Sequence, residues 1–282
     1  TMANLSLLTT VMSANEAVLA ADTAHIHTAE AGAIEFSGHK ILTVRSKDGK
    51  ILPESIERVC SNFEESDQVS RAHVCRPRAV YISFPTEYGT LYSKKELQEI
   101  YEVCKKRDLP LFVDGARLGY GLASSENDVT LEELAQLCDV FYIGGTKVGA
   151  LCGEAVVFTN RRAPKYFVTQ IKQHGALLAK GRLLGIQFDT LFTNDRYFKI
   201  SEHAIYMAEK LKQLFAEKRY RFYLDSPTNQ QFIILENEKL QELSGKVDFS
   251  IWEKQDAEHT VVRFATSWST QEADIEYLST LL

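Results

Sequence analysis

The chain has 282 residues, of which 45% are hydrophobic and 25% charged, and a formal net charge of −6. This length allows one large or two modest domains, and the composition is that of an ordinary globular protein. The negative charge argues against nucleic acid as a partner, because phosphate binding needs concentrated lysine and arginine.

The chain opens with an apolar segment, Met2 to Leu8, that already has the texture of a buried helix. A parallel α/β domain rarely begins in this way, without a strand or a polar lead-in. We therefore expect the natural protein to have more chain upstream, so that the first domain is incomplete at its N-terminus.

Short apolar runs with little alternation follow, as expected for strands that are covered on both faces. The predicted strands are Ala17–Ala21, Ile41–Val44, Ala79–Phe84, Pro110–Val113, Asp139–Ile143 and Ala155–Phe158. Capping boxes at Ser93/Glu96 and Thr130/Glu133 each begin a helix between two strands, and Gly38 ends a helical segment that starts near Thr28. The pattern predicts a mostly parallel sheet with crossover helices.

The hydrophobic pattern changes near Asn194, where a long amphipathic helix that includes Ile200 and Phe215 is predicted to begin. Three short strands and a last helix from about Gln271 are predicted after it; the strands are Phe232–Leu235, Val247–Trp252 and Thr260–Ala265. We expect two domains: a large α/β domain over residues 1–193 and a smaller α+β domain over residues 194–282.

Two polar residues stand at the carboxyl ends of consecutive strands. Asp114 closes the run from Leu109 to Val113, and Lys147 follows the run from Asp139 to Thr146. Ligands of open α/β sheets bind beyond the carboxyl ends of the strands. An amine and a carboxylate at this edge suit pyridoxal 5′-phosphate, which needs a lysine for a Schiff base and an acid for its ring nitrogen.

These segments resemble the low-specificity L-threonine aldolases, in the β-eliminating-lyase group of fold-type I pyridoxal-phosphate enzymes. The resemblance is carried by Asp114-Gly115-Ala116-Arg117 and by Gly145-Thr146-Lys147. It extends to Ala21-Asp22-Thr23-Ala24-His25, Glu30-Ala31-Gly32-Ala33-Ile34 and Val262-Arg263-Phe264-Ala265-Thr266-Ser267-Trp268. It implies a Schiff base at Lys147 and pairing of Asp114 with the pyridine nitrogen.

Further cofactor contacts follow from the resemblance. His25 matches a histidine that stacks on the cofactor ring, and it is also a candidate for moving the proton of the substrate hydroxyl. Thr1 and Met2 match the helix start that binds the cofactor phosphate, where glycines precede the threonine in the family. Thr146 is a second phosphate contact, and Arg182 matches an arginine that reaches a neighbouring subunit's cofactor.

The substrate contacts are implied in the same way. Arg263 matches the arginine that binds the α-carboxylate through two parallel donors, and Arg117 is a second guanidinium near that group. Glu87 departs from the pattern, because many aldolases of the group have a histidine there, near the substrate side chain. A solvated loop glutamate is the alternative interpretation of Glu87.

The implied reaction is the retro-aldol cleavage of L-threonine or L-allo-threonine to glycine and an aldehyde. Another β-lyase or an amino-acid racemase on the same scaffold remains an alternative, because the bond that breaks depends on substrate orientation. A truncated relic that binds ligands or partners without turnover is a further alternative. A nicotinamide dehydrogenase is disfavoured, since no GxGxxG follows a strand.

The resemblance also implies a homodimer or homotetramer with shared active sites and a small amino-acid substrate. No apolar run has membrane-spanning length, and the start lacks a signal-peptide pattern. The five cysteines are widely spaced and form neither a CxxC pair nor a zinc-type cluster, so no structural metal is indicated. We expect a cytoplasmic protein with no membrane partner.

Overall fold

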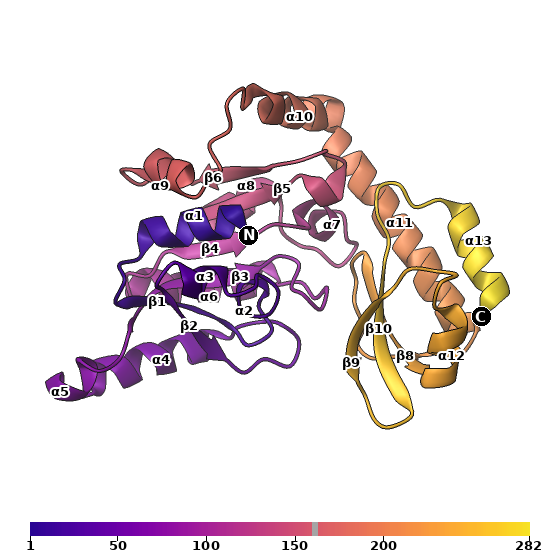
Figure 1. Cartoon of the computed structure of the whole chain (residues 1–282), viewed down its shortest axis with the longest axis horizontal. Coiled ribbons are helices and arrows are strands. Elements are labelled where there is room, and N and C mark those ends of the chain that lie inside the picture. Colours follow the sequence, from indigo (N-terminus) through magenta and orange to yellow (C-terminus); the bar gives the residue numbers. More distant parts are fainter. Residues whose placement is uncertain (160–162) are drawn as a thin grey trace.

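The computed structural model describes residues 1–159 and 163–282. A six-stranded sheet forms the centre of the first part of the chain (Figure 1). Its strands, in spatial order, are β2 (Lys40–Val44), β1 (Glu16–Ala21), β3 (Arg76–Ser83), β4 (Leu111–Asp114), β5 (Val140–Gly144) and β6 (Glu154–Phe158). All neighbours pair in parallel except β5 and β6. The mostly parallel sheet and its six predicted strands are confirmed.

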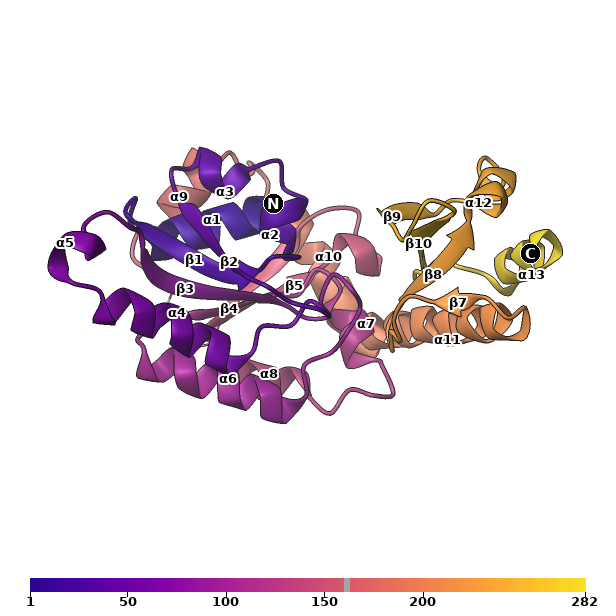
Figure 2. The same cartoon turned by 90° about the horizontal axis from the view of Figure 1, so that it is seen from below.

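Helices cover both faces of this sheet (Figure 2). One face carries α1 (Met2–Val11), α3 (Ala33–Phe36) and α9 (Phe167–Gln173), and the other carries α4 (Pro53–Glu65), α6 (Lys94–Lys106) and α8 (Leu131–Gln136). Both predicted capping boxes are present, at the starts of α6 and α8. The four inner strands β1, β3, β4 and β5 are therefore mostly buried, which explains their continuous apolar sequences, whereas the edge strands β2 and β6 are less buried.

The predicted helix from Thr28 to Gly38 is wrong in part. The structure has two single-turn helices, α2 (His25–Thr28) and α3, separated by Ala31 and Gly32 at positive φ. A left-handed residue interrupts the α-helical hydrogen-bond ladder, so one continuous helix cannot form there. The turn carries Glu30 into the interior, where it is 5% exposed.

A second, antiparallel sheet follows the long helix α11 (Arg196–Glu217). Its strands, in spatial order, are β7 (Arg221–Phe222), β8 (Gln230–Glu236), β10 (His259–Ala265) and β9 (Ser250–Lys254), with α12 (Asn237–Leu243) and α13 (Glu272–Leu281) beside them. The strand predicted at Val247–Trp252 begins three residues later than expected, at Ser250. The smaller C-terminal α+β region is thus confirmed.

The long helix α11 contributes to two hydrophobic cores. Ala204 and Ile205 belong to the core of the large sheet, whereas Leu211 and Phe215 belong to the core of the antiparallel sheet. Remaining elements of the first region are α5 (Gln68–Arg71), α7 (Leu118–Leu122) and α10 (Arg182–Phe192). Among the helices that the structure describes, none combines the length and apolar character that crossing a membrane requires.

Candidate active site

The strand order brings the predicted amine and carboxylate to one edge of the sheet. Asp114 is the last residue of β4, and Lys147 lies in the 3-10 turn Thr146–Val148 directly after the parallel neighbour β5. Burial lowers the pKa of Lys147, nearby Arg117 lowers it further, and Asp114 opposes the shift. The two groups therefore lie within electrostatic reach of each other, on the side where ligands of such sheets bind.

Two glycines allow the loops that carry these groups to touch. The backbone N–H of Gly144 donates to the carbonyl of Gly115 at 2.9 Å. A Cβ on Gly115 would lie 2.0 Å from the carbonyl oxygen of Tyr142, and one on Gly144 would lie 2.3 Å from that of Ala116. Only glycine fits at these two contacts, so the Asp-Gly and Gly-Gly-Thr-Lys sequences are a packing requirement.

Asp114 is 2% exposed and accepts four hydrogen bonds. Its Oδ2 accepts from Asn4 Nδ2 at 3.1 Å and from the Tyr81 hydroxyl. Its Oδ1 accepts from the Ala116 N–H at 2.9 Å and from the Tyr142 hydroxyl. Burial and the Asp114 charge raise the pKa of both phenols, which therefore stay protonated as donors. Among the described residues Asp114 has no ion-pair partner, so a buried carboxylate is held by neutral donors alone.

The start of α1 is tied to the same edge through Asn4 and Glu30. Asn4 Nδ2 also donates to Glu30 Oε1 at 2.9 Å, and the Thr1 amino group lies 3.2 Å from that oxygen. Glu30 Oε2 and Asn4 Oδ1 are buried and have no partner among the described residues. Thr1 and Met2, at the start of α1, are exposed.

Thr146 is exposed and lies on the same turn as Lys147, with its hydroxyl 3.5 Å from Glu154 Oε1. Glu154 also accepts from the Gly145 N–H at 2.7 Å, which fixes this turn against β6. The pKa of Glu154 is raised by burial, with opposing effects from Lys147 and the Thr1 amino group. The structure therefore holds the turn that carries Thr146 and Lys147 against the Glu154 carboxylate.

His25 and Glu87 meet where the strand order reverses, between β1 and β3. His25 is the first residue of α2, and its backbone N–H donates to Glu87 Oε1 at 2.9 Å. The His25 ring lies 3.8 Å from Glu30 Oε1, and burial lowers its pKa against the opposing charges of Asp114 and Glu30. Glu87 is partly buried, and burial raises its pKa to about 7. The alternative of a solvated loop glutamate is wrong.

Two guanidinium groups complete the cluster. Burial and the nearby charge of Arg263 lower the pKa of Arg117 to about 10. Arg263 donates to Gln230 Oε1 at 3.0 Å and Ser250 Oγ at 3.2 Å, and its guanidinium lies 5.2 Å from the Trp252 ring centre. Its Nε is buried without a partner among the described residues. Arg117 and Arg263 are close, partly buried cations, and neither forms an ion pair with a described acidic residue. Such a pair is suited to binding an anion.

Arg182 is the one predicted site residue that the structure does not bring to this cluster. It begins α10 and is exposed, and the structure records no contact between its guanidinium and the other described site residues. Exposed apolar side chains surround it in sequence, with Leu178 55%, Leu183 62% and Ile186 57% exposed.

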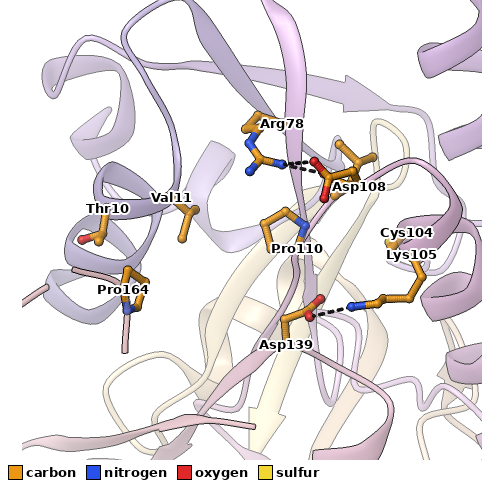
Figure 3. A pocket seen from close by; sticks show the side chains of 10 residues that line it. Thr10, Val11, Arg78, Cys104, Lys105, Asp108, Pro110, Asp139 and Pro164 are labelled. Atoms are coloured by element: carbon orange, nitrogen blue, oxygen red, sulfur yellow. Dashed lines mark hydrogen bonds and ion pairs between the residues drawn. The ribbon is translucent and has the colours of Figure 1, made fainter. Parts of the chain in front are cut away.

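A separate cavity of about 400 Å³ lies at the opposite edge of the sheet (Figure 3). It is lined where β4 and β5 begin, by Pro110 and Asp139 among others. Its charged side chains pair locally: Arg78 lies 3.5 Å from Asp108 and Lys105 lies 3.3 Å from Asp139. This cavity shares no residue with the cluster around Lys147 and is not part of the candidate site.

Sequence reasoning missed the residues that hold Asp114. Tyr81 and Tyr142 lie inside fully buried strands, where a hydroxyl needs a hydrogen-bond partner, and this signal was present in the sequence. Asn4 inside an apolar helix carried a similar signal. Glu30 is part of the segment Glu30–Ile34 that carries the family resemblance. Its burial depends on the turn at Ala31 and Gly32, which the sequence analysis did not predict.

Comparison with known proteins agrees with this geometry. A family model described as beta-eliminating lyase matches residues 1–238. A low-specificity L-threonine aldolase of Pseudomonas sp. is 32% identical over 99% of this chain and 79% of its own length. A second, of Pseudomonas aeruginosa, is 32% identical over 77% of this chain and 62% of its own length.

A solved structure, Leishmania major threonine aldolase, is 40% identical with a TM-score of 0.93, over 99% of this chain and 80% of that one. The predicted resemblance and the fold-type I class are thereby confirmed. The chain belongs to the beta-eliminating lyase family.

Proposed function

We propose that this protein is a pyridoxal-phosphate-dependent aldehyde-lyase that cleaves L-threonine and L-allo-threonine to glycine and acetaldehyde. The observation that carries the proposal is the gathering of Lys147, Asp114 and two guanidinium groups at one sheet edge. The 40% identity to Leishmania major threonine aldolase and the 32% identity to the Pseudomonas enzyme support the same substrate class.

The residues at this edge fit pyridoxal phosphate. Asp114 is a buried carboxylate without a cation among the described residues, and a protonated ring nitrogen would supply one. Lys147 has a pKa lowered by burial, which favours the neutral, nucleophilic amine needed to hold a carbonyl carbon. The N–H groups at Thr1 and Met2 and the hydroxyl of Thr146 would hold the phosphate. When bound, the cofactor supplies an electron sink for the bond that breaks at Cα.

The chain's own groups provide orientation and proton transfer. Arg263 offers its buried, unpartnered Nε toward an anion, and Arg117 adds a second cation, so the pair holds the substrate α-carboxylate. His25 presents a ring that is 38% exposed, flat for stacking and able to move the hydroxyl proton directly or through water. Glu87 lies beside it, where the side chain of the substrate is expected.

We also propose that the protein acts as a homodimer or homotetramer in which copies share active sites. Exposed apolar side chains recur along the chain from the turn after β5 into α10: Leu151, Tyr166, Val168, Leu177, Leu178, Leu183 and Ile186. Large exposed apolar patches on a monomer usually mark an interface. A second copy seated there would bring Arg182 toward its neighbour's cofactor.

We include the location, the metabolic role and the domain division in the same proposal. A cytoplasmic location and a role in glycine metabolism accord with the proposed reaction. The division into residues 1–193 and 194–282 is supported by two hydrophobic cores, one for each sheet. Helix α11 packs against both cores, and a smaller third cluster joins Tyr88 to Phe232.

The test is product analysis after incubation with pyridoxal phosphate and L-threonine, with L-cysteine and D-threonine as parallel substrates. We expect glycine and acetaldehyde in equal amounts from L-threonine. Pyruvate from L-cysteine as the main product would favour a β-lyase. Conversion of L-threonine to D-allo-threonine, which inverts only Cα, would favour a racemase. Bound cofactor without turnover of any substrate would favour the relic.

A further inference from the structure

Glu87 joins two elements that meet at the point where the strand order reverses. Its Oε1 accepts from the Ser83 hydroxyl at 2.6 Å, at the end of β3, and from the His25 backbone N–H at 2.9 Å. Ser83 pairs in register with Asp114 on the neighbouring strand β4. One carboxylate oxygen thus connects the strand beside Asp114 to the helix that carries His25.

The helix α2 has no cap of its own. Its N-cap residue is Ala24, which offers no side-chain acceptor, and the helix has only four residues. The first N–H groups of a helix lack partners within the helix, and a single turn is unstable without outside support. The Glu87 carboxyl accepts from the N–H of His25 through Oε1. When it is ionised it also places negative charge at the helix start, where such charge is favourable.

We propose that Glu87 is a positioning residue, whose carboxylate holds the first turn of α2 and thereby fixes the His25 ring over the site. The inference rests on the proposed function only for the role of His25, because the contact itself belongs to the folded chain. Many aldolases of the group have a histidine where this chain has Glu87. One carboxylate oxygen of Glu87 accepts both hydrogen bonds at once, which an imidazole nitrogen could not do in the same way.

The surroundings of Glu87 keep its second oxygen available. Oε2 makes no hydrogen bond to the described residues. The charged and titratable groups that face the carboxyl are Asp114 from β4, Arg117 before α7, His25 from α2, Tyr81 from β3, and Tyr88 and Tyr92 after β3. Asp114 raises the pKa of Glu87, whereas the bonds from Ser83 and His25 lower it.

The experiment compares Glu87→Gln, Glu87→Ala and Ser83→Ala by histidine NMR titration of the protein without cofactor, with the His25 signal assigned from His25→Asn. Glutamine keeps an oxygen that accepts from both donors, so the low His25 pKa is expected to persist. Alanine frees the helix and admits water, so the His25 pKa is expected to rise toward 6.5. Ser83→Ala keeps the bond to His25 and is expected to have a smaller effect.

An unchanged His25 titration in Glu87→Ala would overturn the proposal, as would equal effects of glutamine and alanine. Since this readout needs neither cofactor nor substrate, it can succeed when the proposed aldolase activity fails, and the two failures are distinguishable.

A double-mutant cycle then tests the route of the effect in the holoenzyme. Glu87→Ala is expected to lower kcat/KM about tenfold, the effect of losing one hydrogen bond to a charged group, with rescue by glutamine. In a His25→Ala background the same change should cost little, because its effect passes through the ring. Equal losses in both backgrounds would show that Glu87 acts independently of His25.

Discussion

At the scale of single residues, the site is built around a buried carboxylate held by neutral donors. Asp114→Asn keeps the shape but removes the charge, so affinity for pyridoxal phosphate is expected to fall at least about 100-fold. Tyr142→Phe is the matched control, because it removes one donor and leaves the carboxylate, and its loss should not exceed about tenfold. Spectroscopic titration with cofactor measures both, and similar affinities for Asp114→Asn and wild type would contradict this role.

The raised pKa of Glu87 makes stability depend on pH. Below about pH 4.5 the carboxyl is protonated in the folded and the unfolded chain. As pH rises toward 7 the unfolded chain releases this proton while the folded chain keeps it, so the folded state loses stability. Urea unfolding is therefore expected to show wild type losing stability relative to Glu87→Gln between about pH 5 and 7. Parallel curves across that range would refute the shift.

The sequence predicted the reacting groups of the site better than the residues that support them. Asp114 and Lys147 follow apolar strands directly, so strand prediction alone places them at one edge. Asn4 reaches Asp114 from the opening helix, across 110 residues of chain, and the same Asn4 amide reaches Glu30 on an irregular turn, across 26 residues. Such contacts depend on tertiary packing, which local periodicity does not encode.

At the scale of elements, close backbone contacts set the separation of Asp114 and Lys147. Gly144→Ala would place a Cβ 2.3 Å from the Ala116 carbonyl oxygen, so the β4 and β5 loops must separate. We expect lower stability and weaker cofactor binding. Gly185→Ala in α10 is the control, because its Cβ meets nothing within 4 Å, and it should stabilise the helix by about 0.5–1 kcal/mol.

Thermal unfolding and cofactor titration of the two glycine variants provide the measurement. If Gly144→Ala unfolds and binds cofactor like wild type, the contact between the two loops is not what positions the site. If Gly185→Ala alone is destabilising, α10 has a neighbour at that face, which an interface between copies would provide.

Elements with strong local signals were predicted closely, and those without them were not. The capping boxes of α6 and α8 and the apolar strands gave nearly correct starts. The segment Thr28–Gly38 was predicted as one helix, but two residues at positive φ interrupt it; Gly32 carries a sequence signal for this conformation, whereas Ala31 carries none. The start of β9 was misplaced for a related reason: Val247 and Phe249 are apolar but pack against the core from the loop before the strand.

At the scale of the whole molecule, the exposed apolar side chains near α10 predict association. Ile186→Glu puts a charge into this patch and is expected to lower the mass measured by analytical ultracentrifugation. Val69→Glu in α5 is the control: its side chain is 70% exposed but lies on a different element, so the mass should not change. A wild-type protein that sediments as a monomer would contradict the proposed assembly.

The Schiff-base role of Lys147 is tested most directly by reducing the protein with borohydride in the presence of pyridoxal phosphate and mapping the modified peptide by mass spectrometry. We expect one reduced cofactor adduct per chain, on Lys147, and no adduct in Lys147→Ala. Modification of a different lysine, or an unchanged adduct in Lys147→Ala, would contradict the assignment of this residue and the function built on it.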